Sequence, residues 1–282
     1  TVAEASGVLG WDVHALVRNG PAETLNRTEK TQPALLAAGI AVWRIWQRQE
    51  LPPPTALAGH SLGEYTALVA AGALDFGDAL KLVELRGQLM QAAVPEGVGG
   101  MAAVIGLEDA KVEILCREYP GTEVLEPVNY NAPGQVVVAG QAAALDWLTA
   151  NGKAHGARMV MRLPVSVPSH CSLMKNAADR LAERLIQVSI RPPAIPVFHN
   201  LDAESHASPD AIRHALKEQL FKPVRWTQTI RSLNSHGIAL FLECGPGKVL
   251  CGLGKRILME TKNIALEDTQ GLTAAAESVR SA

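Results

Sequence analysis

The sequence contains little of what several classes of protein require. Only 4% of its 282 residues are aromatic and its formal net charge is −2, so we expect neither the stacking platforms nor the basic surfaces that bind nucleic acids. No apolar run approaches the length of a membrane span, and we expect no membrane contact. The four cysteines form no C-x-x-C pair. We therefore expect reduced thiols in the cytoplasm, with no disulfide and no metal site.

The elements that the sequence does predict change character twice along the chain. In the first part, apolar helices surround one short strand at 55–58. Between 97 and 166 the predicted order is β-α-β-β-α-β, the arrangement of a ferredoxin-like unit. After that, strands and helices alternate, with a buried strand at 238–242, which indicates a mainly parallel sheet covered on both faces. We therefore expect an α/β protein with a large subdomain of residues 1–96 and 167–282 and an inserted small subdomain of residues 97–166.

A G-x-S-x-G motif at residues 59–63 surrounds Ser61. An apolar run precedes it and a good helix former follows, so a strand, a sharp turn and a helix would hold the serine hydroxyl on an exposed corner. Both glycines are expected where the turn packs too tightly for a side chain. The helix N-terminus supplies free backbone N–H groups that suit an oxyanion. This context predicts a nucleophile, whereas the motif alone also fits an ordinary tight turn.

A serine nucleophile needs a base, and His170 is the strongest candidate among the eight histidines. Pro168 fixes the backbone just before it, and a predicted helix over 173–187 follows. His60 adjoins the serine, but the neighbour of an elbow nucleophile points away from it. The residues alone leave a capped loop histidine as an equal alternative for His170.

The helix predicted over 78–94 carries an arginine on its apolar face. Helical spacing places Arg86 in one stripe with Leu82, Leu89 and Ala93. A buried arginine is costly unless it is paired or reaches a cavity. A stem that snorkels to water and a structural ion pair are the plain alternatives. The functional one is a guanidinium that forms a bidentate pair with a substrate carboxylate.

Four motifs together resemble the bacterial malonyl-CoA:acyl carrier protein transacylases. They are residues 59–65 around Ser61, 85–90 around Arg86, 168–171 around His170, and the run ECGPGKVL at 243–250. The resemblance extends from end to end in one register. It implies the acyltransferase fold, a hydrolase-like α/β core with a ferredoxin-like insertion. It also implies malonyl transfer from malonyl-CoA to acyl carrier protein for fatty acid biosynthesis, without a metal or redox cofactor.

The resemblance assigns roles to four residues of this chain. Ser61 would be the nucleophile, His170 its base and Arg86 the partner of the malonyl carboxylate. The histidine would be oriented by the backbone carbonyl of Gln219 rather than by an acid. This agrees with the lack of an obvious triad acid in the sequence.

The resemblance also implies an oxyanion hole and a loop that faces the cleft. The backbone N–H of Leu62 would be one oxyanion donor, and Asn129 and Asn131 match the loop of the small subdomain. In the family, an apolar N-terminal strand ends in a Pro-Gly-Gln-Gly loop whose glutamine gives the second donor. No such sequence occurs here, so this strand and loop are expected to be absent from the chain as printed.

Two other functions fit part of the sequence. An esterase or thioesterase of the α/β-hydrolase type would have the same elbow, but Arg86 in an apolar stripe and the β-α-β-β-α-β insertion argue against it. A docking scaffold without activity would fit a chain that lacks the Pro-Gly-Gln-Gly loop. A transferase also needs positive surface for an acidic carrier protein, and residues 210–231 and 245–262 are rich in lysine and arginine.

Overall fold

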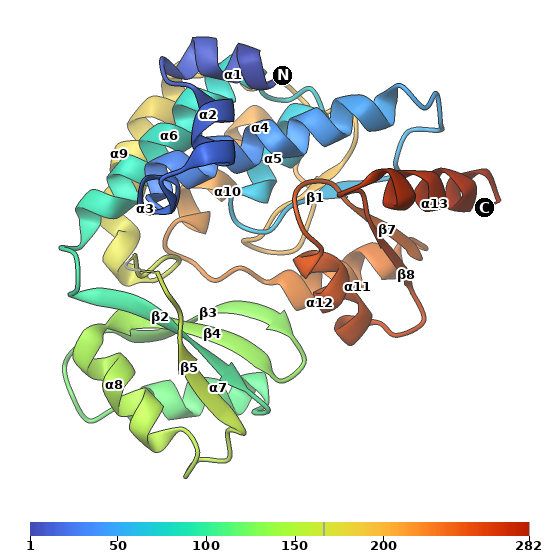
Figure 1. Ribbon diagram of the computed structural model, residues 1–282. Helices are drawn as coiled ribbons and strands as arrows, with labels where there is room; N and C mark the ends of the chain where they lie inside the picture. Colours follow the sequence, from blue (N-terminus) through green and yellow to red (C-terminus); the bar gives the residue numbers. More distant parts are fainter. Residues whose placement is uncertain (166, 282) are drawn as a thin grey trace.

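Two short parallel sheets and one four-stranded antiparallel sheet form the frame of the molecule (Figure 1). The structure, a computed structural model, describes residues 1–165 and 167–281. In the parallel sheets, β1 (Leu57–Ala58) pairs with β6 (Val197–Phe198), and β7 (Leu240–Glu243) pairs with β8 (Lys262–Ala265). The chain therefore has a mixed α/β fold with parallel and antiparallel sheets.

The part of the chain before the four-stranded sheet is mostly helical. Its helices are α1 (Val2–Leu9), α2 (Val13–Asn19), α3 (Ala22–Leu25), α4 (Thr28–Gln47), α5 (Gly63–Ala70) and α6 (Phe76–Ala93). The long helix α4 packs against both α5 and α6. Helix α6 begins slightly before the predicted start because the side chain of Asp75 accepts hydrogen bonds from the N–H groups of Gly77 and Asp78.

The middle segment has the predicted order of elements. They are β2 (Gly99–Ile105), α7 (Asp109–Arg117), β3 (Leu125–Ala132), β4 (Gln135–Gln141), α8 (Ala142–Asn151) and β5 (Met159–Arg162). The strands lie in the order β3-β4-β2-β5, and all neighbours are antiparallel. Val104 and Val138 of the sheet share a buried core with Leu115 of α7 and Leu145 of α8. Both helices therefore cover the same face of the sheet.

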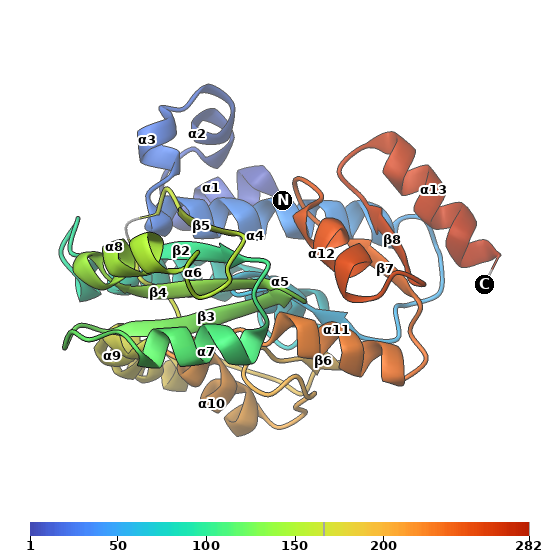
Figure 2. The same ribbon diagram turned by 90° about the horizontal axis from the view of Figure 1, so that it is seen from below.

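The last part of the chain returns to the helical region and then crosses the molecule. Its remaining elements are η1 (Ser172–Met174), α9 (Lys175–Gln187), α10 (Pro209–Gln219), α11 (Trp226–Ser235), α12 (Val249–Ile257) and α13 (Thr269–Arg280). Helix α9 packs against α6 and α10. In both Figure 1 and Figure 2, α11, α12 and α13 lie with β7 and β8 on the side of the molecule opposite α9.

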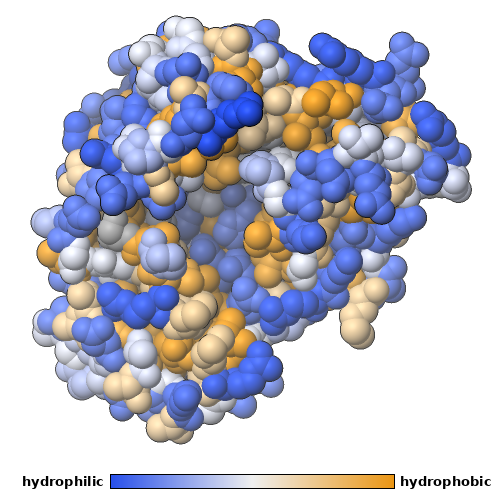
Figure 3. Space-filling view, in the orientation of Figure 1, coloured by the Kyte–Doolittle hydropathy of each residue, from blue (hydrophilic) through white to orange (hydrophobic). Residues whose placement is uncertain are grey.

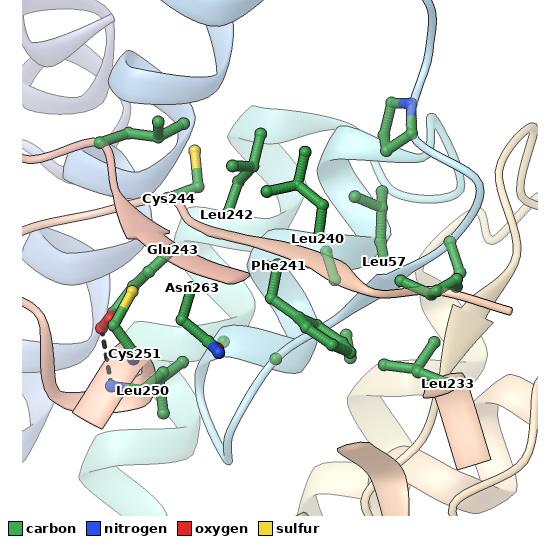
Figure 4. A pocket seen from close by; sticks show the side chains of 18 of the residues that line it. Leu57, Leu233, Leu240, Phe241, Leu242, Glu243, Cys244, Leu250, Cys251 and Asn263 are labelled. Atoms are coloured by element: carbon green, nitrogen blue, oxygen red, sulfur yellow. Dashed lines mark hydrogen bonds between the residues drawn. The ribbon is translucent and has the colours of Figure 1, made fainter. Parts of the chain in front are cut away.

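Two expectations about the parallel sheet predicted around β1 and β7 need correction. The sequence predicted one mainly parallel sheet, but the described residues form two separate parallel pairs. Strands β1 and β7 each have a second edge to which no strand of the described residues is bonded. The strand predicted to be buried at 238–242 is β7, whose residues are all half-buried. The physical reason is a cavity of about 1260 Å³ on its open side, lined by Leu57 of β1 and by Leu240 and Phe241 (Figure 4).

Two further sequence expectations concern thiols and membranes. All four cysteines are free, and Cys116, Cys171 and Cys251 are buried. None of the helices in residues 1–165 and 167–281 combines the length and apolar character needed to cross a bilayer.

Candidate active site

Ser61 lies on a sharp turn between β1 and α5. Its φ of 52° is in the left-handed region, which residues other than glycine seldom adopt. Gly59 is required for this turn, because a Cβ there would lie 1.9 Å from the backbone of Gly63. The prediction of an elbow is therefore confirmed. The reason given for the second glycine is wrong, since a Cβ on Gly63 would meet no atom of the described residues within 4 Å apart from its chain neighbours and the backbone of its own helix.

The side chain of His170 lies between the serine and a backbone carbonyl. Its Nε2 is 2.8 Å from Ser61 Oγ, and its Nδ1 is 2.6 Å from the carbonyl oxygen of Gln219. A carbonyl oxygen can only accept a hydrogen bond, so Nδ1 carries the hydrogen. Nε2 is then unprotonated and faces the serine hydroxyl. This is the arrangement that a general base requires.

The surroundings of His170 keep its imidazole neutral. The residue is 3% exposed, and burial together with the positive charge of Arg86 lowers the pKa of His170 to about 3. The hydrogen bond to Gln219 opposes this shift. His170 also has a left-handed backbone, with φ of 66°, and its N–H donates to the carbonyl of Leu220. The ring is thus fixed on both sides and uncharged at neutral pH.

Arg86 is buried beside the serine rather than at the surface. It is 1% exposed, and the predicted stripe is confirmed because Leu82 and Leu89 are buried with it. Nη2 donates to Ser61 Oγ at 3.1 Å and to Gln219 Oε1 at 3.0 Å. None of the ion pairs among the described residues includes Arg86, and its Nε has no hydrogen-bond partner there. The structure therefore shows neither a snorkelling stem nor a structural ion pair.

Gln219 connects all of these groups. Besides the carbonyl that meets His170, its side-chain Nε2 donates to the carbonyl oxygen of Ser61 at 3.0 Å and to Glu64 Oε2 at 3.0 Å. Its Oε1 accepts from Arg86, and the residue is fully buried. The structure thus brings Ser61, His170, Arg86 and Gln219 into one cluster, from positions far apart in the sequence.

The start of α5 offers a free backbone donor next to the serine. The N–H of Ser61 is already used, because it donates to Asn200 Oδ1 at 2.7 Å. The N–H of Leu62 makes no hydrogen bond to any of the described residues. It lies at the helix N-terminus, where the helix dipole favours negative charge. This N–H is available to an oxyanion that forms on the acyl group.

The structure places the two predicted asparagines differently. Asn131 Oδ1 is 2.8 Å from His60 Nε2, so it contacts the elbow and holds the His60 ring there. Asn129 is 9% exposed, and its backbone forms a bridge with Val224. Its buried Oδ1 has no hydrogen-bond partner among the described residues, so the side-chain oxygen does not bond to Ser61.

Sequence reasoning missed three buried polar residues that support the elbow. Glu64 accepts hydrogen bonds from His199 Nδ1 and from the N–H of Asn200, both at 2.8 Å. The side chain of Asn200 also donates to the carbonyl of Gly59 at 2.7 Å. A signal for Asn200 was present, because it follows β6 at the carboxyl end of a parallel strand, where sites commonly form. Gln32 of α4 was also missed, because no motif in the sequence indicates a role for it.

The face of the molecule that carries the four-stranded sheet is hollowed between that sheet and the helical part above it (Figure 3). The large cavity between β1 and β7 is a separate feature. It reaches the elbow at Gly59, His60 and Leu62 and also touches Asn131, but Ser61, His170 and Arg86 do not line it. The apolar cavity thus adjoins the elbow, while the side chains of the serine cluster lie outside its lining.

Comparisons with known proteins agree on one family. Residues 4–274 match the family model described as the acyl transferase domain. The chain is 51% identical over 277 residues to the malonyl CoA-acyl carrier protein transacylase of Escherichia coli strain K12, covering 98% of this chain and 90% of that protein.

Solved structures are similar throughout the chain. An acyl carrier protein S-malonyltransferase from Vibrio cholerae is 52% identical with a TM-score of 0.94, covering 97% of this chain and 89% of that one. A malonyl-transacylase in complex with its type II PKS acyl-carrier protein is 50% identical with a TM-score of 0.96, covering 98% and 90%.

Proposed function

The chain belongs to the acyl transferase family, and from this membership we propose a double-displacement reaction in which Ser61 carries the acyl group. It is a malonyl CoA-acyl carrier protein transacylase, an acyltransferase that moves the malonyl group from malonyl-CoA to acyl carrier protein for fatty acid synthesis. The observation that carries the proposed mechanism is the 2.8 Å contact between Ser61 Oγ and the neutral His170 Nε2.

In the first half-reaction, Ser61 Oγ attacks the thioester carbonyl of malonyl-CoA while His170 Nε2 takes the hydroxyl proton. The oxyanion that forms accepts a hydrogen bond from the free N–H of Leu62. The carbon–sulfur bond then breaks, and His170 returns the proton to the sulfur of CoA. The products are malonyl-O-Ser61 and CoA.

In the second half-reaction, the phosphopantetheine thiol of acyl carrier protein takes the place of CoA. His170 accepts the proton of this thiol, and the sulfur attacks the ester carbonyl of malonyl-O-Ser61. The carbon–oxygen bond breaks, and the proton passes from His170 to Ser61 Oγ. No group outside the chain and its two substrates is needed for these steps.

Arg86 gives the site its preference for malonyl. Its guanidinium is buried, contacts Ser61 Oγ and has no carboxylate partner among the described ion pairs. A malonyl group on Ser61 brings a carboxylate to this charge, and the pair forms where little water competes. A simple esterase has no use for an uncompensated buried cation beside its nucleophile.

The arrangement of elements supports the two proposed subdomains. Residues 97–166 form the ferredoxin-like small subdomain, and residues 1–96 and 167–282 form the hydrolase-like large one; positions 166 and 282 lie outside the described residues. The strand order β3-β4-β2-β5 with two helices on one face is that of a ferredoxin-like unit. The contact of Asn131 with His60 brings β3 to the elbow, so the cleft between the subdomains receives the acyl group.

The groove between β1 and β7 supports one further part of the proposed site. Both strands have an outer edge without a strand partner among the described residues, and apolar side chains line the space between them (Figure 4). An extended strand in this groove would join the two parallel pairs into one sheet. A Pro-Gly-Gln-Gly loop at its end would bring a second oxyanion donor to the elbow.

We place the enzyme in the cytoplasm, where its four free thiols remain reduced.

Labelling with malonyl-CoA tests the proposed nucleophile. Incubation should add one malonyl unit to the peptide that contains Ser61, measured by intact mass and peptide mapping. Ser61→Ala should take up no label, whereas Ser208→Ala, a change at an exposed helix cap, should be labelled like the wild type. Burial raises the pKa of both Cys171 and Cys244 to about 12, so neither thiol should react. Label on either cysteine would overturn the assignment.

A further inference from the structure

Among the described residues, all hydrogen-bond acceptors of the Arg86 guanidinium are neutral oxygens. Nη1 donates to Gln32 Oε1 at 2.6 Å, and Nη2 donates to Gln219 Oε1 and to Ser61 Oγ. Burying a charge is costly unless it is paired, and the usual partner of a buried arginine is a carboxylate. Here two amides fill that place. They satisfy hydrogen-bond donors of the guanidinium without forming an ion pair with it.

The nearby carboxylate is kept from pairing with the arginine. Burial lowers the pKa of Arg86, and Tyr65 and the fully buried Glu64 oppose this shift. The amide of Gln219 lies between the two, because its Nε2 donates to Glu64 and its Oε1 accepts from Arg86. Glu64 is in addition occupied by His199 and by the backbone of Asn200. The anion on this side of the site is therefore separated from Arg86 by a neutral group.

Gln32 is fixed so that its oxygen faces Arg86. It lies on α4 and is 5% exposed. Its Nε2 donates to Thr28 Oγ1 at 2.8 Å and contacts Met90 Sδ at 3.5 Å. The nitrogen has its own partners, so the oxygen is the atom left for the guanidinium. A glutamate would fit the same space, yet it would place a full negative charge next to Nη1.

We propose that Gln32 is a specificity-determining positioning residue, whose neutral amide aims Arg86 without neutralising it, so that the guanidinium charge stays available to the carboxylate of the acyl group. This inference rests on the proposed role of Arg86 in binding malonyl. A carboxylate at position 32 would pair with Arg86 in every state of the enzyme. The malonyl carboxylate would then have to displace it, and the preference for acyl groups with a carboxylate would be lost.

The test compares two substitutions of similar size. Gln32→Glu keeps an oxygen acceptor and adds a charge, whereas Gln32→Met removes the acceptor and adds none. The measurement is kcat/KM for acylation of Ser61 by malonyl-CoA and by acetyl-CoA, followed by mass. Gln32→Glu should lower the malonyl-to-acetyl ratio by about ten- to a hundredfold, the range expected for a lost charge-assisted hydrogen bond. Gln32→Met should slow malonyl transfer but retain most of the ratio.

Controls separate charge from general damage. Gln141→Glu makes the same change at an amide that accepts a hydrogen bond from the N–H of Val124 in the small subdomain, and it should leave the ratio unchanged. In the Arg86→Ala background, Gln32→Glu should have no further effect on the ratio. If Gln32→Glu does not fold, judged by thermal unfolding, Gln32→Asp and Gln32→Asn provide a second pair that differs only in charge.

The possible outcomes distinguish this inference from the proposed function. If the wild type prefers malonyl and Arg86→Ala removes that preference, the role of Arg86 stands. In that case an unchanged ratio in Gln32→Glu, or an equal loss in Gln32→Met, overturns the inference about Gln32 alone. If the wild type shows no preference for malonyl, or keeps it in Arg86→Ala, both the role of Arg86 and that of Gln32 fail.

Discussion

Two regions beside the Ser61 elbow, the cluster around Arg86 and the groove between β1 and β7, differ in how their polar groups are satisfied. In the cluster around Arg86, buried side chains bond to one another, and Gln219 alone contacts a histidine, an arginine, a serine and a glutamate. At the groove, β1 and β7 turn open backbone edges toward a cavity lined by apolar side chains such as Leu57 and Phe241 (Figure 4). In the first region the side chains hold one another, and in the second the backbone edges of two strands have no strand partner among the described residues.

This difference separates the chemistry of the site from its support. A network whose members already hold one another is preorganised, so little reorganisation is needed when charge develops on the acyl group. Open strand edges beside apolar side chains are instead a place where another strand adds hydrogen bonds and excludes water. We therefore expect the reacting groups to be in place and the sheet behind them to be the weaker region.

The largest expected effect comes from filling the groove. An N-terminal extension with an apolar strand and a Pro-Gly-Gln-Gly loop should raise turnover by about a hundred- to a thousandfold, because one oxyanion donor is worth that much. It should also make the protein monodisperse, since an open apolar edge favours aggregation. Turnover with malonyl-CoA and light scattering measure the two effects.

A second extension separates the effect of the added strand from that of the added oxyanion donor. The same segment with alanine in place of the loop glutamine should remove the aggregation but restore only part of the turnover. If the printed 282-residue chain is monodisperse and as fast as the extended one, the groove needs no strand and the proposed oxyanion hole is wrong.

The next effect concerns the cluster around Arg86. Arg86→Ala should lower malonyl acylation by about ten- to a hundredfold and change acetyl acylation little, because only malonyl has a carboxylate to pair. Arg86→Lys should recover part of the loss, since an ammonium cannot form the planar fork. Initial rates with both thioesters measure this. An unchanged acetyl-to-malonyl ratio in Arg86→Ala would mean that the arginine only supports the fold.

The local features of the site were predictable because each has a short-range signal. The elbow around Ser61 follows from glycine spacing and the flanking elements, and the position of Arg86 follows from helical periodicity. The geometry agrees with both predictions. The contact of Ser61 with His170 was suggested by the family resemblance, since the residues alone gave two equal alternatives for the histidine.

The long-range features were not predictable from pattern. Gln32 and Glu64 are ordinary polar residues in helices, where an exposed face is the usual explanation, and only the fold places them beside Arg86 and Gln219. Strand pairing is equally non-local, so the sequence predicted parallel strands but not that β1 and β7 would lie apart. The burial of β7 was misjudged because its second edge faces the cavity and has no strand partner among the described residues, which the local pattern does not show.

A smaller effect is expected from surface charge, which lies outside both regions. Lys248 is exposed and pairs with Glu267 at 3.7 Å, and Arg256 donates to Gln135. Reversing both charges, Lys248→Glu and Arg256→Glu, should slow transfer to the acidic carrier by roughly three- to tenfold and leave acylation by malonyl-CoA intact. Single-turnover rates of the two half-reactions measure this.

The matched control for these charges is Lys153→Glu, at an exposed position after α8, which should slow neither half-reaction. Equal loss in both half-reactions of the Lys248 and Arg256 variant would indicate damage to the serine site rather than to a docking surface.

The smallest effect is that of pH on the wild type, and it depends on the same buried network. Because the pKa of His170 is lowered from 6.5 to about 3, its neutral, proton-accepting form persists through mildly acidic solution. Acylation of Ser61 between about pH 8 and pH 5 should therefore change less than about twofold. An acid limb with its midpoint near the ordinary histidine value would contradict the burial of the ring.

Arg86→Ala tests the cause of this pH dependence, because the charge of Arg86 is one of the causes that lower the pKa of His170. Without it, the acid limb should move to higher pH. Stability also falls as the solution becomes acidic. Between the unfolded and the folded pKa of His170, the unfolded chain binds more protons than the folded one. The contribution of His170 to the free energy of unfolding is thus complete above about pH 6.5 and declines as the pH falls toward the folded pKa of about 3. Thermal unfolding across this range should show a smaller decline in Arg86→Ala, whereas an equal decline would mean that burial alone determines the shift.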